Sequence, residues 1–185
     1  MDDMLEKYAL FTVFRTLRET DTEESIRSLS RKANVGVATA KRCIDYLYEK
    51  NIVKRKIIGN LHQYSLDNES LLTRQLKIAM TSADIVESGL VEEIAKKYPE
   101  IHSIVWYGST AIGTDSPQSD IDIAVIARAP LRLKPLSAET RLKREVSLSS
   151  FTLQEWRKKA RTDKAYYDAV IIDGICIHGE MPVVV

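Results

Sequence analysis

Two hydrophobic segments close together in the second half of the chain constrain its fold more than any other feature. They cover residues 101–107 and 120–126, and each has the length and the run of β-branched residues that are typical of a buried strand. Because side chains alternate along a strand, Asp120 and Asp122 share one face of the second segment, while the alternate isoleucines enter the core. The chain is therefore expected to contain a sheet that presents two neighbouring carboxylates.

The residues around this carboxylate pair suit a phosphate and a divalent cation. Two carboxylates on one strand face repel each other, and a divalent cation between them relieves that repulsion. Gly108 lets backbone amides approach an anion closely, and Ser109 adds a hydroxyl donor at the start of the next helix. The loop of residues 113–119 is long enough to fold back over this site. These are the parts that phosphoryl or nucleotidyl transfer requires. Taken alone, Asp120 and Asp122 would also fit surface carboxylates on an edge strand.

The order of these features resembles the signature of the polymerase-beta-type nucleotidyltransferase superfamily: a hydrophobic strand, Gly-Ser, ten intervening residues, and Asp-hydrophobic-Asp-hydrophobic. The resemblance covers residues 90–179, and the small MNT-like members are the most similar in size; one of them acts as the antitoxin beside a HEPN toxin. It implies that Asp120 and Asp122 are catalytic and ligate Mg²⁺. It also implies that Gly108 and Ser109 hold the triphosphate of ATP or another nucleotide.

The resemblance also implies a third carboxylate on a neighbouring strand, which helps to deprotonate the acceptor. That strand is expected at residues 145–151, where Ser147 or Ser149 stands in place of an acid. Glu145 lies on the same alternating face and is our substitute candidate for the third catalytic acid. Glu155 is the last residue of a T-x-x-E capping box and is assigned to a helix start instead. Without a positioned base, the site fits a slow enzyme, an enzyme that uses an ionised group of its target, or a nucleotide-binding relic.

The N-terminal part of the chain predicts three helices followed by a hairpin. Apolar residues recur at helical spacing, and two alternating segments then flank a Gly-Asn turn. The expected helices cover residues 4–19, 24–33 and 37–50, and the expected strands cover residues 52–58 and 61–66. This order resembles a winged helix-turn-helix domain, in which the third helix enters the major groove of DNA and the hairpin touches phosphates.

Charge supports a DNA-facing interpretation of this part. Residues 23–66 hold nine basic and four acidic residues, a net charge of +5, and basic side chains near phosphates gain salt-dependent affinity. By resemblance, the candidate DNA-binding residues are Thr39, Lys41, Arg42, Lys54, Arg55 and Lys56. The alternative is a module for dimerisation or partner contact. DNA-binding winged helices often pair to match two half-sites, so a homodimer is a further expectation.

A second basic stretch follows the Asp pair. Residues 128–144 hold six basic residues and one acidic residue, again a net charge of +5. These side chains fit contact with a triphosphate or an acidic partner, and they equally fit a flexible basic loop.

The composition excludes several other classes of protein. Hydrophobic residues make up 44% and charged residues 29% of the 185-residue chain, which excludes disorder and collagen-like repeats. No apolar run approaches the roughly 20 residues of a membrane span, and two aspartates near the start replace the basic residues of a signal peptide. Cys43 and Cys176 are far apart, so neither a disulfide framework nor a Cys-based zinc site is indicated. We expect a cytoplasmic protein with no membrane partner.

Together these patterns predict an α+β protein of three parts. The parts are a winged helix-turn-helix domain at residues 1–67, a linking helical segment at residues 68–98, and a nucleotidyltransferase domain at residues 99–185, whose mixed sheet has flanking helices. The first functional hypothesis is a Mg²⁺-dependent nucleotidyltransferase that moves AMP from ATP to a protein or small acceptor, with a HEPN-type toxin as one candidate. The alternative is a DNA-binding regulator whose degenerate transferase domain senses nucleotide. A protein scaffold would leave the Asp pair unexplained.

Overall fold

The computed structural model describes residues 8–98, 100–131 and 136–184 of the chain. The chain divides into two compact units, Met1–Ala83 and Asp84–Val185. The boundary falls inside the segment predicted as a link, so residues 68–83 belong to the first unit and the rest of that segment to the second. Each unit is described by itself.

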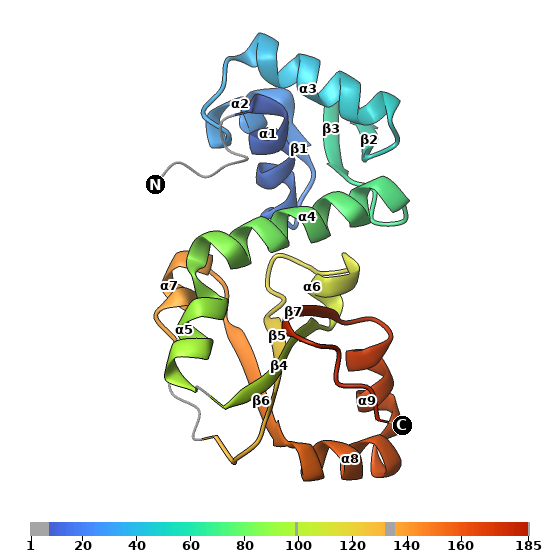
Figure 1. The fold of residues 1–185 in the computed structure, drawn as a ribbon. Helices are drawn as coiled ribbons and strands as arrows, with labels where there is room; N and C mark the ends of the chain where they lie inside the picture. Colours follow the sequence, from blue (N-terminus) through green and yellow to red (C-terminus); the bar gives the residue numbers. More distant parts are fainter. Residues whose placement is uncertain (1–7, 99, 132–135, 185) are drawn as a thin grey trace. The chain divides into compact units, whose positions relative to one another are not determined.

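The first unit combines short helices with a three-stranded antiparallel sheet of order β1-β3-β2 (Figure 1). Its elements are α1 (Ala9–Arg18), β1 (Glu24–Ser25), α2 (Ile26–Lys32), α3 (Val37–Glu49), β2 (Val53–Ile58), β3 (Leu61–Leu66) and the larger part of α4 (Leu71–Ser88). Asn51 has a φ of 55° just after α3, and Gly59 has a φ of 60° in the β2–β3 turn. Both residue types tolerate this left-handed conformation, so they end the helix and reverse the chain.

One predicted boundary in this unit is wrong. A helix was expected from residue 24, but Glu24 pairs with Tyr64 of β3, and α2 begins only at Ile26. Ser25 caps the helix, because its hydroxyl accepts a hydrogen bond of 3.2 Å from the backbone N–H of Ser28. Pairing with a distant strand therefore overrides a locally helical pattern. Residues 4–7 of the first predicted helix lie outside the described residues.

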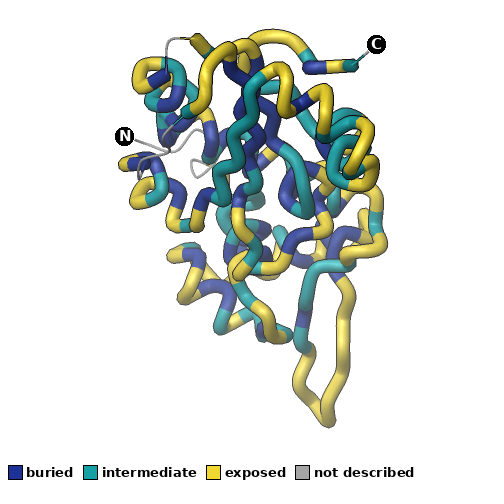
Figure 2. Tube along the Cα trace, turned by 90° about the horizontal axis from the view of Figure 1, so that it is seen from below, coloured by how far each residue is buried: buried dark blue, intermediate teal, exposed yellow. Residues whose placement is uncertain are grey.

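The core of the first unit comes from the apolar faces of its three leading helices and from β3. Phe14, Leu29, Ile44, Leu47 and Tyr64 are each at most 5% exposed. Burying a side chain of this size stabilises the fold by about 1.5–3 kcal/mol. The β2–β3 hairpin, by contrast, is exposed at every position from residue 54 to residue 62 (Figure 2).

The second unit is built around a four-stranded sheet of order β6-β5-β4-β7. Its elements are α5 (Leu90–Lys97), β4 (Ile101–Tyr107), α6 (Ser109–Ile112), β5 (Ile121–Ala127), α7 (Ala138–Leu142), β6 (Val146–Thr152), α8 (Leu153–Thr162), α9 (Lys164–Ile171) and β7 (Ile175–Gly179). β5 and β6 are parallel, whereas β4 is antiparallel to both β5 and β7. The predicted α+β class with a mixed sheet and flanking helices is therefore confirmed.

Helices cover this sheet on both faces. Figure 1 shows α5 and α7 on one side and α8 and α9 on the other. Val105, Ala124 and Ile126 share the face that packs against Trp156 of α8 and Val170 of α9. Since side chains alternate, Asp122 lies on this same face, at the end where β5 begins. The helices α8 and α9 thus cover the sheet face on which Asp122 lies.

No helix among the described residues has both the length and the apolar content that crossing a bilayer requires.

Candidate active site

The candidate site begins at the sharp turn after β4. Gly108 has a φ of 77° and a ψ of −164°, a conformation that L side chains rarely adopt. A Cβ built on Gly108 would lie 2.3 Å from Oδ2 of Asp122. The sequence suggested that this glycine lets an anion approach the backbone. The structure shows a more specific reason for it: the glycine leaves room for the carboxylate of Asp122.

Asp122 lies on β5, which is flanked by β4 and β6. The register places Tyr107 of β4 on one side of it and Ser147 of β6 on the other. Asp122 is half-buried, and burial raises the pKa of its carboxyl; the negative charge of Asp120 raises this pKa further, while a hydrogen bond from the Ser147 hydroxyl lowers it. Asp120 is exposed, just before β5.

These two residues fit a divalent cation. Their charges repel each other in a partly desolvated place, and hard oxygen ligands of this kind suit Mg²⁺. The glycine cradle beside Asp122 holds one carboxylate in position for such an ion. The structure thus brings Gly108, Asp120 and Asp122 together.

Hydroxyl groups complete the wall beside Asp122. The Tyr107 and Tyr166 hydroxyls lie 3.0 Å apart, and their rings meet edge to face with centroids 5.5 Å apart. Burial raises the pKa of Tyr166 far above its ordinary value, and its hydrogen bond with Tyr107 and the charge of Asp122 act in the same direction, whereas a hydrogen bond with Ser149 opposes them. Tyr166 therefore stays a neutral hydrogen-bonding group at physiological pH.

Sequence reasoning missed this tyrosine pair. Tyr166 belongs to α9 and lies far along the chain from β4, so only the folded topology brings it to the site. Its one sequence signal is the helical spacing to Val170, which places it on the buried face of α9.

The loop between α6 and β5 is tied down at several points. Nη1 of Arg144 lies 3.1 Å from Oδ2 of Asp115 and also donates to the Ser119 carbonyl at 3.3 Å. The Asp115 side chain is fully buried. The backbone N–H of Ser116 donates to the Ser119 hydroxyl at 2.9 Å. The predicted covering loop is therefore an ordered connection that delivers Asp120 to the start of β5.

Arg144 comes from the second basic stretch, for which the sequence offered either a phosphate contact or a flexible loop. Its guanidinium instead bonds to Asp115 inside the protein. Arg132 and Lys134 of the same stretch lie outside the described residues.

The third acid is the weakest part of the predicted site. Glu145 is exposed and directly precedes β6, and its carbonyl accepts a hydrogen bond of 2.9 Å from the Ile121 N–H. Among the described residues, which include Asp120, Asp122 and Glu145, no three or more His, Cys, Asp or Glu side chains converge as a metal site. The structure therefore does not group Glu145 with the Asp pair. Ser147 is the β6 residue level with Asp122.

Ser109 opens the short helix α6, as expected, and its side chain is half-buried. Its carbonyl accepts hydrogen bonds from the N–H groups of Gly113 and Thr114. Trp106, just before the turn, is 1% exposed, and its indole N–H donates to the Thr110 hydroxyl at 2.8 Å. These contacts fix the Gly108 turn between β4 and α6.

In the first unit, the candidate DNA-binding residues are mostly exposed, but several are already paired. Lys41 forms an ion pair with Asp45 on α3, and the Arg55 guanidinium lies 4.8 Å from the centre of the Tyr48 ring. The remaining lysine pairs are Lys54–Asp67 at 2.9 Å and Lys56–Glu23 at 2.8 Å. Arg42 is exposed, and Thr39 is half-buried. The paired carboxylates reduce the positive potential that this surface presents.

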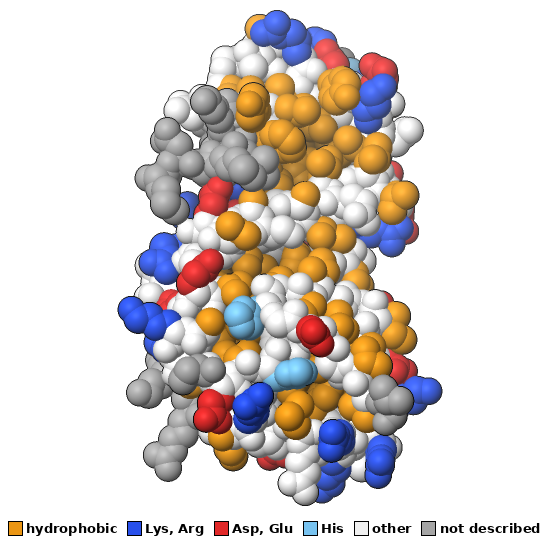
Figure 3. Space-filling model, viewed as in Figure 1, with side chains coloured by type: hydrophobic (Ala, Val, Ile, Leu, Met, Phe, Trp, Pro, Cys, Tyr) orange, Lys and Arg blue, Asp and Glu red, His pale blue; other side chains and the backbone are white. Residues whose placement is uncertain are grey.

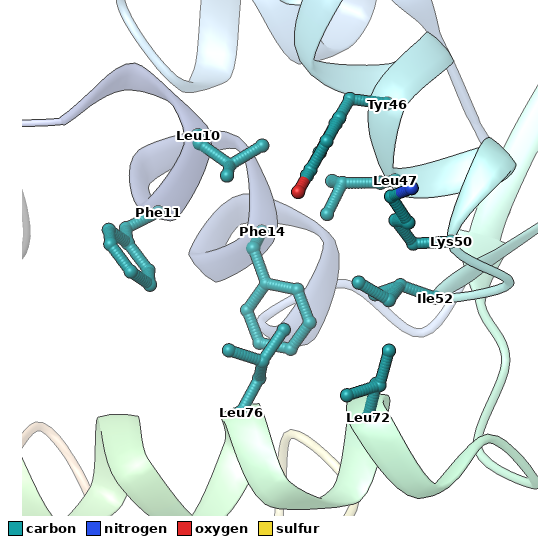
Figure 4. Close-up of a pocket in the computed structure, with 9 residues that line it drawn as sticks. All are labelled: Leu10, Phe11, Phe14, Tyr46, Leu47, Lys50, Ile52, Leu72 and Leu76. Carbon is teal, nitrogen blue, oxygen red and sulfur yellow. The ribbon is translucent and has the colours of Figure 1, made fainter.

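The first unit also holds an apolar pocket that the sequence did not indicate. Its volume is about 270 Å³, and Figure 3 shows hydrophobic side chains gathered over α1, α3 and α4. Figure 4 shows the lining residues, which are Leu10, Phe11, Phe14, Tyr46, Leu47, Lys50, Ile52, Leu72 and Leu76. Among the described lining residues, Lys50 is the one that carries a charge, and its Nζ lies 3.0 Å from Glu49.

Comparison with known proteins agrees with the geometry of the second unit. Residues 90–180 match the family described as polymerase beta, nucleotidyltransferase. This range contains the whole sheet, the Gly108 turn and the Asp pair. Residues 90–180 of the second unit are therefore similar to a nucleotidyltransferase domain of the polymerase beta kind.

No curated protein matches the chain. Among solved structures, the chain is similar to the solution NMR structure of protein BT2368 from Bacteroides thetaiotaomicron. The sequence identity is 23%, the match covers 37% of this chain and 83% of that chain, and the TM-score is 0.31. A likeness of this size supports no argument about function.

Proposed function

We propose that the second unit is a Mg²⁺-dependent nucleotidyltransferase that moves AMP from ATP to a protein or small acceptor. One observation carries the proposal: the carboxylate of Asp122 fits against Gly108, and Asp120 stands two residues before it. All three residues lie inside the range that matches the family. A HEPN-type toxin is one candidate acceptor, on the resemblance to MNT-like proteins alone.

The residues of the site have separate roles in this reaction. Asp120 and Asp122 hold the cation, and the Ser147 hydroxyl orients Asp122 through its hydrogen bond. The turn at Gly108 and Ser109 receives phosphate oxygens. When bound, Mg²⁺ offsets phosphate charge and polarises the phosphoryl oxygens.

The transfer itself exchanges one bond for another. The acceptor oxygen bonds to the α-phosphorus as the bond from that phosphorus to the bridging oxygen breaks. Pyrophosphate leaves, and the acceptor proton passes to water. The protein contributes positioning and charge stabilisation, which account for most of the catalysis in reactions of this type.

Calorimetric titration with ATP, with and without Mg²⁺, tests this proposal. We expect Mg²⁺-dependent binding to wild type and its loss in the Asp120→Asn, Asp122→Asn double variant. Glu100→Gln is the matched control, because Glu100 is exposed and precedes the opposite end of β4. Equal binding by the double variant, or no binding by wild type at millimolar ATP, would contradict the proposal.

A second proposal concerns the first unit, which we infer to be a DNA-binding module of the winged helix-turn-helix kind. The exposure of Lys41 and Arg42 on α3, and of residues 54–56 on the projecting hairpin, supports it. Under the alternative function, this module makes the protein a regulator whose transferase domain senses nucleotide without turnover.

Salt dependence of DNA binding tests the second proposal. Each phosphate contact contributes about 0.9 to the slope of log affinity against log salt concentration. We expect Lys41→Ala and Arg42→Ala each to weaken binding to duplex DNA and to reduce this slope by about one unit. Lys50→Ala is the control, because Lys50 lines the apolar pocket. A slope that stays the same in both variants would place the contact surface elsewhere.

A further inference from the structure

We propose that the candidate site holds a single divalent cation, which enters with the nucleotide, because Ser147 occupies the position from which a third carboxylate would bind a second one. This inference rests on the proposed nucleotide site. It concerns how many cations the site holds, which the family match leaves open.

The strand register shows which side chains lie level with Asp122. Tyr107, Asp122 and Ser147 form one row across β4, β5 and β6, on one face of the sheet. The Ser147 hydroxyl donates a hydrogen bond to the Asp122 carboxylate. A side chain at residue 147 therefore reaches the same oxygen atoms that Asp122 offers to a cation.

The neighbours of Ser147 carry no charge that could replace an acid. Next to it on this face, Ser149 follows on β6, and both Ser149 and Tyr107 hydrogen-bond to Tyr166. Glu145 lies at the exposed end of the strand and does not converge with the Asp pair. On this side, Asp122 therefore faces neutral hydroxyls.

The number of carboxylates at the site then limits how many divalent cations it can hold. Two divalent ions about 3.5–4 Å apart repel each other strongly, and carboxylates that bridge them offset the repulsion. Here the protein supplies two carboxylates, which match the charge of one ion. Triphosphate oxygens complete the ligand sphere of an ion that arrives with ATP. Apart from the Asp pair and the triphosphate, the described residues next to Asp122 on this face offer a second ion serine and tyrosine hydroxyls and no further carboxylate.

The experiment counts Mn²⁺ ions by electron paramagnetic resonance, with α,β-methylene-ATP as the nucleotide. We expect one nucleotide-dependent Mn²⁺ per wild-type chain and two per chain of Ser147→Asp. Ser150→Asp is the matched control, because it adds the same charge to the opposite face of β6 and is expected to keep one ion.

Thermal unfolding adds a second readout. A third carboxylate beside the Asp pair raises repulsion in the metal-free protein, so Mn²⁺ with the analogue should raise the melting temperature of Ser147→Asp more than that of wild type. If Ser147→Asp does not fold without metal, it should fold with Mn²⁺ present.

Two ions per wild-type chain would overturn the inference, as would a folded Ser147→Asp that still binds one ion. A wild-type chain with no nucleotide-dependent Mn²⁺ would instead overturn the proposed function, and this inference with it.

Discussion

At the scale of single residues, the candidate site depends on two small residues, Gly108 and Ser147, as much as on its two aspartates. Gly108 leaves the space that the Asp122 carboxylate occupies, and Ser147 leaves the neighbouring position without a charge. Both features follow from which residues the sheet places opposite each other. The Asp pair could be predicted from its spacing, but the contact between Gly108 and Asp122 could not, because it joins two strands.

Replacing Gly108 with alanine tests this contact. A Cβ at this position would meet Oδ2 of Asp122 at 2.3 Å and would sit at a φ of 77°. This backbone conformation, which only glycine adopts readily, costs another residue about 1–3 kcal/mol, and the collision displaces the carboxylate. We expect Gly108→Ala to lower stability modestly and to abolish Mg²⁺-dependent nucleotide binding, as measured by thermal unfolding and calorimetry.

Gly59→Ala distinguishes the effect of backbone strain from the effect of a Cβ that collides with the Asp122 carboxylate. Gly59 also has a positive φ, 60°, but a Cβ there would have no neighbour within 4 Å. This variant should lose stability by a similar amount and keep wild-type nucleotide binding. If Gly108→Ala binds Mg²⁺ and nucleotide as wild type does, the position of the Asp122 carboxylate against the glycine has no role in the site.

At the scale of elements, the sequence predicts what depends on local patterns. The strands β4, β5 and β6 lie within a residue or two of the predicted segments. The predicted capping box is confirmed, because Thr152 and Glu155 bond to each other's backbone N–H at the start of α8. These features need only alternation and short-range hydrogen bonds, which one stretch of chain contains.

Contacts between distant elements could not be predicted in this way. The pairing of Glu24 with β3, the Arg144–Asp115 ion pair and the meeting of Tyr107 with Tyr166 all join residues far apart in sequence. Nothing in the local pattern around Arg144 distinguishes a solvated charge from a buried one. The order of the loop before Asp120 can therefore be recognised only in the folded structure.

One such contact ties α5 to α7 and has a pH dependence. An ion pair with Lys97, together with hydrogen bonds from Ser137 and from the Ala138 N–H, lowers the pKa of Glu93 to about 2, although burial opposes this. The Ser137 N–H and hydroxyl donate at 2.9 and 2.8 Å, and the Ala138 N–H donates at 3.0 Å. Glu93 thereby caps the start of α7.

The sign of the effect follows from the lowered pKa. Since Glu93 has a pKa of about 2 when folded and an ordinary value of 4.5, its stabilisation is fully present above pH 4.5 and is lost as pH falls toward 2. We expect Glu93→Gln to lower the free energy of unfolding at pH 7 by about 1–3 kcal/mol. The difference from wild type should be smaller at pH 3, as measured by urea unfolding.

Glu92→Gln is the control for this prediction. Glu92 is the exposed neighbour of Glu93 in the first turn of α5, and its replacement should change stability little at either pH. A Glu93→Gln effect that is equally large at pH 3 and pH 7 would mean that side-chain shape, not charge, links the two helices.

At the scale of the whole molecule, the chain carries two candidate functions in two compact units. The nucleotide site uses residues of the second unit alone, and the candidate DNA surface uses residues of the first unit alone. Since they share no residue, the simplest expectation is that each can be removed without loss of the other. The regulator alternative requires the opposite, because a sensor must change DNA affinity when nucleotide binds.

Thermodynamic linkage distinguishes these two cases. If Mg²⁺ and ATP change the affinity for DNA by some factor, DNA must change the affinity for Mg²⁺ and ATP by the same factor. We expect no such coupling: Asp122→Asn should keep DNA affinity within about twofold, and Lys41→Ala with Arg42→Ala should keep wild-type nucleotide binding, since additive effects are usual for sites that share no partners. Fluorescence anisotropy with labelled duplex DNA, with and without Mg²⁺ and ATP, makes the measurement. A reciprocal change of fivefold or more, the size typical of allosteric coupling, would replace the transferase with the nucleotide-sensing regulator as the better account of this chain.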